Sequence, residues 1–188
     1  MEDSKVELIK LVEDTKNEDK DAFAKLIEKV KHKLYKTAMS ILKNDDDACD
    51  AIQETLLKAY QSINTLKNNE FFITWIIRIL INNCYDIIRK NKKITYLDEN
   101  LVSSQDTYYD LYSQESSLEY VLNKLDKDLK LVTVLYYYDD LSISQISEII
   151  NIPEGTVKSR LSRARDKIYA ILKEEEGENV GWQKRSIY

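Results

Sequence analysis

The fold is decided by Leu141-Ser142-Ile143-Ser144-Gln145-Ile146-Ser147-Glu148-Ile149-Ile150-Asn151-Ile152-Pro153-Glu154-Gly155-Thr156-Val157-Lys158-Ser159-Arg160-Leu161-Ser162-Arg163-Ala164-Arg165. Its isoleucines recur at helical spacing, which predicts a short helix with one buried face. Pro153 cannot continue that helix. A second apolar stripe then begins at Val157 and continues through Leu161, Ala164 and Ile168. The stretch therefore predicts two helices joined by a tight turn.

The other face of the second helix is basic. Between Glu154 and Lys173, six Lys and Arg stand against two acids, a local charge of +4 in a chain of net charge −5. A helix that is buried on one side and basic on the other fits the DNA major groove. Charged helix faces are also common as solvated surface. The helix-turn-helix spacing favours DNA, and so do the small polar residues that alternate with the cations, since they allow close approach to base edges.

Composition narrows the fold and function classes. Three glycines and one proline in 188 residues are too few for a turn-rich sheet protein, so we expect an all-α fold. Cys49 and Cys84 lack the spacing of a zinc site, and no glycine-rich phosphate loop is found. The only histidine, His32, has no nucleophile or carboxylate pattern around it. We therefore expect no enzyme activity, no catalytic residue, no cofactor and no metal.

The apolar segments are short. The longest run, near Trp75–Ile81, is interrupted by Arg78, so no stretch is expected to reach the ~20 residues that span a bilayer. The N-terminus carries Glu2, Asp3 and Glu7, unlike a signal peptide. These features predict a cytoplasmic protein without direct membrane insertion.

Helical periodicity runs through the first half of the chain. Apolar residues keep a 3.6-residue rhythm over about 5–15, from Asp19 to Ile41, from Ala48 to Ile63 and from Phe71 to Arg89. In the third of these segments, the spacing predicts a buried face of Ala48, Ile52, Leu56, Ala59 or Tyr60, and Ile63. Together the segments predict an N-terminal helical domain over residues 1–93.

An acidic segment follows. From Tyr96 to Glu119 the chain has no Lys or Arg and six acids. We interpret residues 94–116 as a flexible acidic linker, with an ordinary surface loop as the alternative; loops of this length are uncommon inside compact domains. Helical periodicity resumes over 117–176, and a tail covers 177–188. The prediction is two small helical domains joined by a linker, the C-terminal one a helix-turn-helix.

Three blocks in this order resemble the extracytoplasmic-function (ECF) sigma factors, a two-domain class of bacterial transcription initiation factor. They are Asp50–Tyr60 (DAIQETLLKAY), Phe72–Ile79 (FITWIIRI) followed by Asn82, Asp86, Arg89 and Lys90, and Leu141–Arg165. The resemblance covers roughly Leu8 to Leu172, apart from the linker. The chain departs from the family at Leu66-Lys67-Asn68-Asn69, where an aromatic-basic-glycine opening is common, and at Asp140, where a glycine is common.

The resemblance implies a function and three sets of residues. The protein would bind core RNA polymerase and promoter DNA, recognise the minus-thirty-five and minus-ten elements and help open the DNA, and an anti-sigma factor is a further expected partner. The implied polymerase-binding residues are Asp50, Gln53, Glu54 and Leu57. The implied minus-ten residues are Lys67, Asn68, Asn69, Asn82, Asp86, Arg89 and Lys90. The implied minus-thirty-five residues are Thr156, Lys158, Ser159, Arg160, Ser162 and Arg163.

Residue chemistry alone leaves plainer interpretations open for these sets. The Asp50–Tyr60 helix could be a routine amphipathic helix with a Glu54–Lys58 pair. Asn82 and Asp86 share a helix face, where an amide can recognise a base edge or simply face solvent. Trp75, Ile76 and Ile79 are expected in the core. The cations from Arg89 onward could contact phosphate or stabilise a helix end.

One alternative function comes from a different class of protein. A helix-turn-helix transcriptional regulator without a sigma role could carry the same Thr156–Ser159 start and basic helix. Such a regulator would bind duplex DNA without polymerase, usually as a dimer. It would not need the Asp50–Tyr60 and Trp75–Arg89 blocks.

Overall fold

A computed structural model describes the backbone of residues 2–97 and 117–185, and the side chains of residues 5–91 and 120–173. These ranges contain helices and no strand, which confirms the all-α prediction. Residues 98–116, most of the predicted linker, lie outside the described residues. The first half comprises α1 (Glu2–Lys16), α2 (Lys20–Leu42), α3 (Asp45–Ser62), the 3-10 turns η1 (Ile63–Thr65) and η2 (Asn69–Phe71), and α4 (Phe72–Leu97). The second comprises α5 (Ser117–Asn123), α6 (Lys127–Thr133), the π-helical turn η3 (Val134–Tyr138), α7 (Ile143–Ile150) and α8 (Glu154–Arg185).

Local signals set the starts of the helices. The Asp19 side chain accepts hydrogen bonds from the backbone of Asp21 and Ala22 at the start of α2. Asn44 caps α3, whose first turn holds three aspartates that suit the positive end of the helix dipole. Ser142 and Gln145 form a reciprocal capping box at the start of α7. Two helices run further than the sequence indicated: α4 enters the predicted linker as far as Leu97, and α8 enters the predicted tail as far as Arg185.

The buried face of α3 differs from the one that periodicity indicated. Its fully buried residues are small: Ala48, Ala51, Thr55 and Ala59. Ile52 and Leu56 are only half-buried against the core, and Tyr60 is exposed. The prediction centred the face on the bulky residues, but small side chains allow α3 to approach α2 and α4 closely while the isoleucine and leucine fill the flanks.

Helix α4 is the central core helix of the first half. Phe72, Ile76, Ile77, Leu80 and Ile81 are almost completely buried in it. The stretch Asn69–Asn91 has a mean hydropathy of 1.4 and is long and apolar enough to cross a membrane, so the expectation that no stretch reaches that length was wrong. Its composition has a simpler explanation here, because these apolar side chains pack against α2 and α3.

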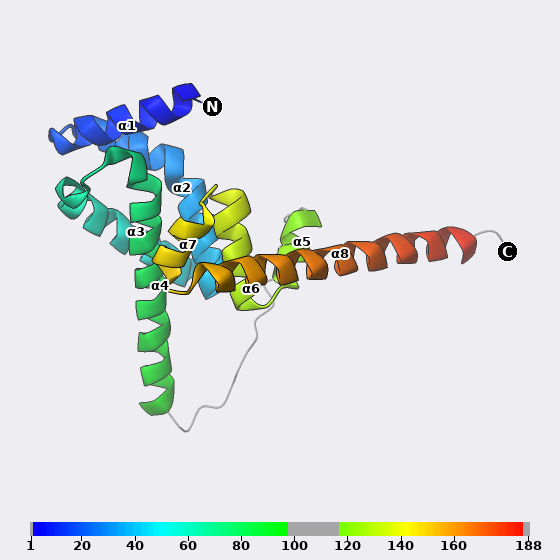
Figure 1. The fold of residues 1–188 in the computed structure, drawn as a ribbon. Coiled ribbons are helices and arrows are strands. Elements are labelled where there is room, and N and C mark those ends of the chain that lie inside the picture. The colour runs from blue at the N-terminus through cyan, green and yellow to red at the C-terminus, as the bar shows by residue number, and fades with distance from the viewer. Residues whose placement is uncertain (1, 98–116, 186–188) are drawn as a thin grey trace.

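The helix-turn-helix forms as the sequence predicts. Ile146 and Ile149 are buried on α7, and Val157, Leu161 and Ala164 are buried on α8. Asn151 ends α7 in a left-handed conformation, with φ of 53°, and Pro153 immediately precedes α8. Figure 1 shows the far half of α8 projecting away from the remaining helices.

The two halves pack together and share one hydrophobic core. Leu131, Val132, Leu135, Leu141 and Ile146 of the second half belong to the same buried cluster as the residues of α2 and α4. Helix α7 contacts α4, and α6 contacts α2 (Figure 1). The picture of two domains held only by a tether was therefore incomplete: an apolar face on each half is buried against the other.

Polar contacts accompany this shared core. The Thr37 hydroxyl donates to Asp139 Oδ2 at 2.8 Å, and both residues are buried. The Lys33 ammonium donates to the Tyr138 carbonyl at 2.7 Å and lies 3.5 Å from an Asp140 carboxylate oxygen. Asp140 has a φ of 58°, in the left-handed region that favours glycine. The backbone thus explains why glycine suits this position, and the aspartate here gains a contact with α2.

Asp139 makes the closed arrangement sensitive to pH. Burial raises the pKa of its carboxyl to about 7, although the Thr37 hydroxyl and the Lys33 charge act in the opposite direction. Its Oδ1 has no hydrogen-bond partner among the described residues. Because the pKa in the unfolded chain is lower, this group contributes stability at acidic pH that is lost as the pH rises through about 7.

We predict that Asp139→Asn flattens the pH dependence of stability. The amide can still accept from Thr37 but cannot ionise, so the loss between pH 5 and pH 8, about 2–3 kcal/mol in the wild type, should largely disappear. Denaturant unfolding at both pH values measures it. The difference between variant and wild type isolates Asp139 from other titrating groups. Equal slopes for the two proteins would contradict the assignment.

Candidate functional site

The first candidate surface is the outer face of α3. Asp50, Gln53, Glu54 and Leu57 are all exposed there, and the Leu57 residue is 53% exposed. Tyr60 lies one turn further on, and its ring packs 5.0 Å from that of Phe23. An apolar side chain among hydrogen-bond acceptors suits a partner helix that offers apolar and basic groups.

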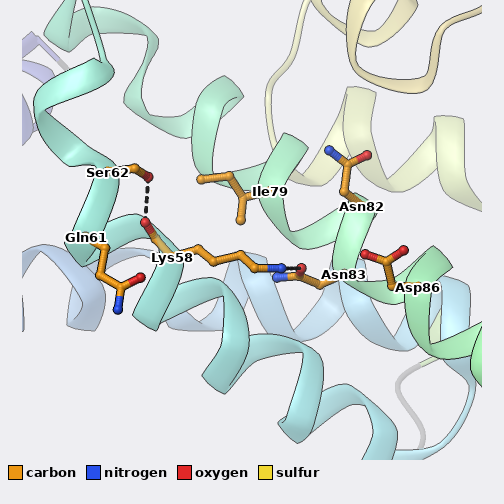
Figure 2. Close-up of a pocket in the computed structure, with 7 residues that line it drawn as sticks. All are labelled: Lys58, Gln61, Ser62, Ile79, Asn82, Asn83 and Asp86. Carbon is orange, nitrogen blue, oxygen red and sulfur yellow. Dashed lines mark hydrogen bonds between the residues drawn. The ribbon is translucent and has the colours of Figure 1, made fainter.

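The second candidate site is a pocket of about 340 Å³ between α3 and α4, here named the α3–α4 pocket (Figure 2). Its lining is mostly polar: Lys58, Gln61, Ser62, Ile79, Asn82, Asn83 and Asp86. Figure 2 shows the Lys58 side chain reaching from α3 toward Asn83 on α4, with Asn82 and Asp86 beside it. The pocket has the size and polar groups to hold one nucleic-acid base.

Two of the seven residues expected at the minus-ten site line this pocket, namely Asn82 and Asp86. Arg89 forms an ion pair with Asp86 from one turn further along α4. The hydrogen bond from Arg89 lowers the pKa of the Asp86 carboxyl below its ordinary value. Lys90 is exposed further along the same helix.

The other three expected residues lie in the loop before α4 and do not line the pocket. Lys67 is exposed, and the Asn68 side chain caps η2 by accepting from the Glu70 backbone at 2.9 Å. Asn69 Oδ1 accepts from the Lys16 ammonium at 2.6 Å, and Lys16 also donates to the Leu66 carbonyl. This loop is therefore held against α1.

Sequence reasoning missed four polar lining residues, which are Lys58, Gln61, Ser62 and Asn83. Lys58, Gln61 and Ser62 stand at i, i+3 and i+4, so one face of α3 was recognisably polar. That signal does not show which helix lies opposite. Asn82 and Asn83 are adjacent and identical in the sequence, so nothing local distinguishes them. In the structure Asn83 is buried and Asn82 is exposed.

The third candidate surface is the first half of α8. Lys158, Ser159, Ser162 and Arg163 are exposed on it, and Thr156 is half-buried. The Ser159 hydroxyl donates to the Thr156 carbonyl at 2.9 Å. The helix therefore presents small polar groups and cations together, as the sequence predicts for a recognition helix.

Arg160 lies differently from the other expected residues of this surface. Its guanidinium pairs with Asp128 on α6, and its side chain is only 21% exposed. The charges of both residues act on Tyr85 of α4, whose pKa burial raises. Val157 and Leu161, near the start of α8, belong to the same buried cluster as Phe72 and Ile76 of α4. Arg160 is occupied within the protein in this arrangement.

Comparison with known proteins identifies the family. The family model "Sigma-70 region 2" matches residues 26–94, and "Sigma-70, region 4" matches residues 116–168. The ECF RNA polymerase sigma factor SigW of Bacillus subtilis is 33% identical over 182 residues, which cover 88% of this chain and 96% of SigW. SigV of the same organism is 34% identical over 134 residues, 71% of this chain and 81% of SigV. The chain belongs to the ECF sigma factors of bacterial RNA polymerase.

Solved structures agree with this assignment. The sigma factor RpoE of Bartonella quintana, in complex with the anti-sigma factor NepR, aligns with a TM-score of 0.65 and 26% identity, over 80% of this chain and 96% of RpoE. CnrH, solved with the cytosolic domain of CnrY, aligns with a TM-score of 0.63 and 20% identity, over 89% of this chain and 98% of CnrH, and supports the fold.

The family decides between the two functions that the sequence allowed. The protein is an RNA polymerase sigma factor, which binds core polymerase and promoter DNA. The match to region 2 covers α3 with its exposed face and most of α2 and α4. A regulator without a sigma role would not need that half, so this alternative is excluded.

Proposed function

We propose that this factor acts in the cytoplasm without catalysis of its own, through the three surfaces described above. The α3 face would bind core polymerase, the α3–α4 pocket would hold an unstacked base of the minus-ten element, and the exposed face of α8 would enter the major groove at the minus-thirty-five element. The observation that carries the proposal is the placement of Asn82 and Asp86 in one base-sized pocket on the region 2 helix.

The polymerase surface is supported by exposure and chemistry. Asp50, Gln53 and Glu54 offer acceptors around Leu57, a leucine whose surface is 53% exposed. Burying such a side chain against a partner contributes roughly 1.5–3 kcal/mol. A basic partner helix with an apolar stripe would satisfy both parts of the surface.

The promoter requires the two halves to separate. Elements centred near minus ten and minus thirty-five lie ~85 Å apart along duplex DNA, at 3.4 Å per base pair. In the closed arrangement α7 contacts α4, and Val157 and Leu161 of α8 share one buried cluster with α4. A rigid closed protein cannot reach both elements, so we propose that polymerase binding replaces the shared core with contacts of its own. Opening would also release Arg160 if Asp128 moves away from it.

An anti-sigma factor is the further partner that we propose, because the related RpoE was solved with one. A groove of about 680 Å³ lies between the N-terminal part of α4 and α7. It is lined on one side by the exposed Phe71 and by Trp75, and on the other by Ser144 and Glu148. A partner seated there would touch both halves and hold them closed.

We predict that Asn82→Ala impairs promoter opening. The residue is exposed on α4, where alanine improves helix propensity slightly, so the fold should persist. The loss of hydrogen bonds to an unstacked base should reduce permanganate reactivity of the promoter with core polymerase, relative to wild type, by about tenfold.

A polymerase pull-down is the control for Asn82→Ala, because the α3 face is unchanged. Unaltered opening would remove Asn82 from the minus-ten site. Lost helicity, or lost pull-down together with lost opening, would show that Asn82 is structural.

We predict different behaviour for Lys158→Ala and Arg160→Ala. Lys158 is exposed, so its loss should not alter stability. It should weaken promoter recognition, measured as transcription at a mapped promoter, by roughly 1–3 kcal/mol if Lys158 touches a base and by less if it touches phosphate. Arg160→Ala should reduce transcription and also lower thermal stability, because it breaks the pair with Asp128. Run-off transcription and melting curves measure both effects. Full transcription by both variants would contradict the recognition-helix assignment.

A further inference from the structure

The Lys16 side chain fastens the loop before α4 to the end of α1. Lys16 is the last residue of α1, and its ammonium donates to the Leu66 carbonyl and to Asn69 Oδ1, both at 2.6 Å. Leu66 lies 50 positions further along the chain. Hydrogen bonds from a charged donor are stronger than neutral ones. This pair of contacts, here named the Lys16 clip, is therefore a strong restraint on the loop.

The clip holds the loop on both sides of its exposed tip. The tip is Lys67 and Asn68, which are exposed and lie between the two residues that accept from Lys16. The side-chain oxygen of Asn68 accepts from the Glu70 backbone at 2.9 Å. Because that oxygen is occupied, the donors that the tip can offer to a partner are the Asn68 amide nitrogen and the Lys67 ammonium.

Lys16 lies outside the segment that the family model covers. The region 2 match begins at residue 26, after the end of α1. The loop itself is a place where this chain departs from the family, since Leu66-Lys67-Asn68-Asn69 stands where an aromatic-basic-glycine opening is common. A side chain from outside the matched segment thus holds a loop that differs from the family pattern.

We propose that Lys16 is a positioning residue for promoter opening, which holds the Lys67–Asn68 tip in one conformation before DNA binds. The inference rests on the minus-ten role proposed for the first half, and on the expectation that the loop before α4 takes part in it. A loop that is already ordered in the free protein loses little conformational freedom when DNA binds. The clip would therefore favour the open promoter without touching DNA.

The expected size of the effect follows from the population of the ordered loop. If loss of the clip leaves the competent conformation populated about a tenth of the time, the apparent affinity for the opened strand falls about tenfold. Other restraints on the loop remain. The Leu66 side chain is buried, and the Phe71 N–H donates to the Asn68 carbonyl at 3.1 Å. The loop should therefore become looser without unfolding.

A purely structural role is the alternative, because the clip also joins α1 to the rest of the first half. Helix α1 has other attachments. Val12 is completely buried and belongs to the shared core, and the Lys5 ammonium lies 3.7 Å from a carboxylate oxygen of Glu70. The fold should therefore persist when Lys16 is replaced.

Permanganate reactivity of a mapped promoter with core polymerase tests the inference. Lys16→Met keeps an unbranched apolar side chain but removes the donor, and it should reduce opening about tenfold relative to wild type. In the free protein it should speed hydrogen exchange of the Phe71 amide and leave the core amides of α4 unchanged. Lys16→Arg keeps a charged donor and should restore part of the opening.

A double-mutant cycle tests whether Lys16 acts through the loop. Asn69→Ala removes one of the two acceptors of the clip. In the Lys16→Met background it should have less effect on opening than in the wild type, because the clip is already lost. Additive effects of the two substitutions would show that the residues act independently.

Lys5→Met is the matched control. It removes the same charge from the same helix, but the Lys5 ammonium faces the Glu70 carboxylate and not the acceptors of the clip. It should leave opening unchanged. Melting curves and polymerase pull-down, measured for every variant, identify any loss that comes from folding or from the α3 face.

Four results would overturn the inference. Normal opening by Lys16→Met would show that the clip is not needed, and unchanged exchange of the Phe71 amide would show that it does not order the loop. An equal loss in Lys5→Met would indicate general charge attraction. Opening lost only together with pull-down or helicity would make Lys16 structural. Absence of promoter opening by the wild type would instead contradict the proposed function itself.

Discussion

The burial of α6 and α7 against α2 and α4 is the constraint on which the rest of this structure depends. Leu135, Leu141 and Ile146 complete a core that the first half begins with Leu34, Phe72 and Ile76. Hydrophobic burial of this kind has no directional preference, so polar contacts such as Thr37–Asp139 are needed to define one arrangement. The same contact places a titratable group in the shared core, and stability in the closed state thereby becomes dependent on pH.

The same packing distinguishes the closed arrangement of the free protein from the open form proposed for the complex with polymerase. In the closed arrangement the start of α8 is buried in the same core as α4, and Arg160 is paired with Asp128. For polymerase binding to separate the halves, as proposed, the free energy of its contacts with them has to exceed that of the shared core. In the proposed open form, the two recognition surfaces move apart without unfolding of either half.

The sequence predicted most of the helices but not how they meet. The Val157–Ala164 stripe was predicted and is confirmed. The caps at Asp19, Asn44 and Ser142 are local features of the same kind, seen in the structure. The buried face of α3 was misjudged because hydrophobicity ranks Ile52 above Ala51, whereas close helix packing favours the alanine. The contact between the halves was missed because α6 and α7 both pack on α8 within the second half. Their apolar residues could therefore be assigned to that packing alone.

In the candidate site, too, the sequence indicated residues within one helix but not the contacts between helices. Asn82 and Asp86 were proposed from motif and spacing, and both line the pocket. Their role at the minus-ten element stays a prediction. Lys58 was taken for half of an ordinary i, i+4 ion pair, which it also is. Its second partner, Asn83, lies 25 residues away on another helix, and no local pattern reveals that contact.

Separation of the two halves on promoter binding is the central claim, and one distance measures it directly. Burial raises the pKa of the Cys84 thiol to about 12 and keeps it unreactive. Cys49→Ser removes the exposed thiol beside the α3 face, and Lys31→Cys, at an exposed site on α2, provides the first label. Tyr169→Cys on α8, at a site 69% exposed, provides the second label. We predict one short label-to-label distance in the free protein and a distance longer by tens of ångströms, on the scale of the ~85 Å between the elements, with core polymerase and promoter. A long distance in the free protein, or no lengthening in the complex, would contradict the account.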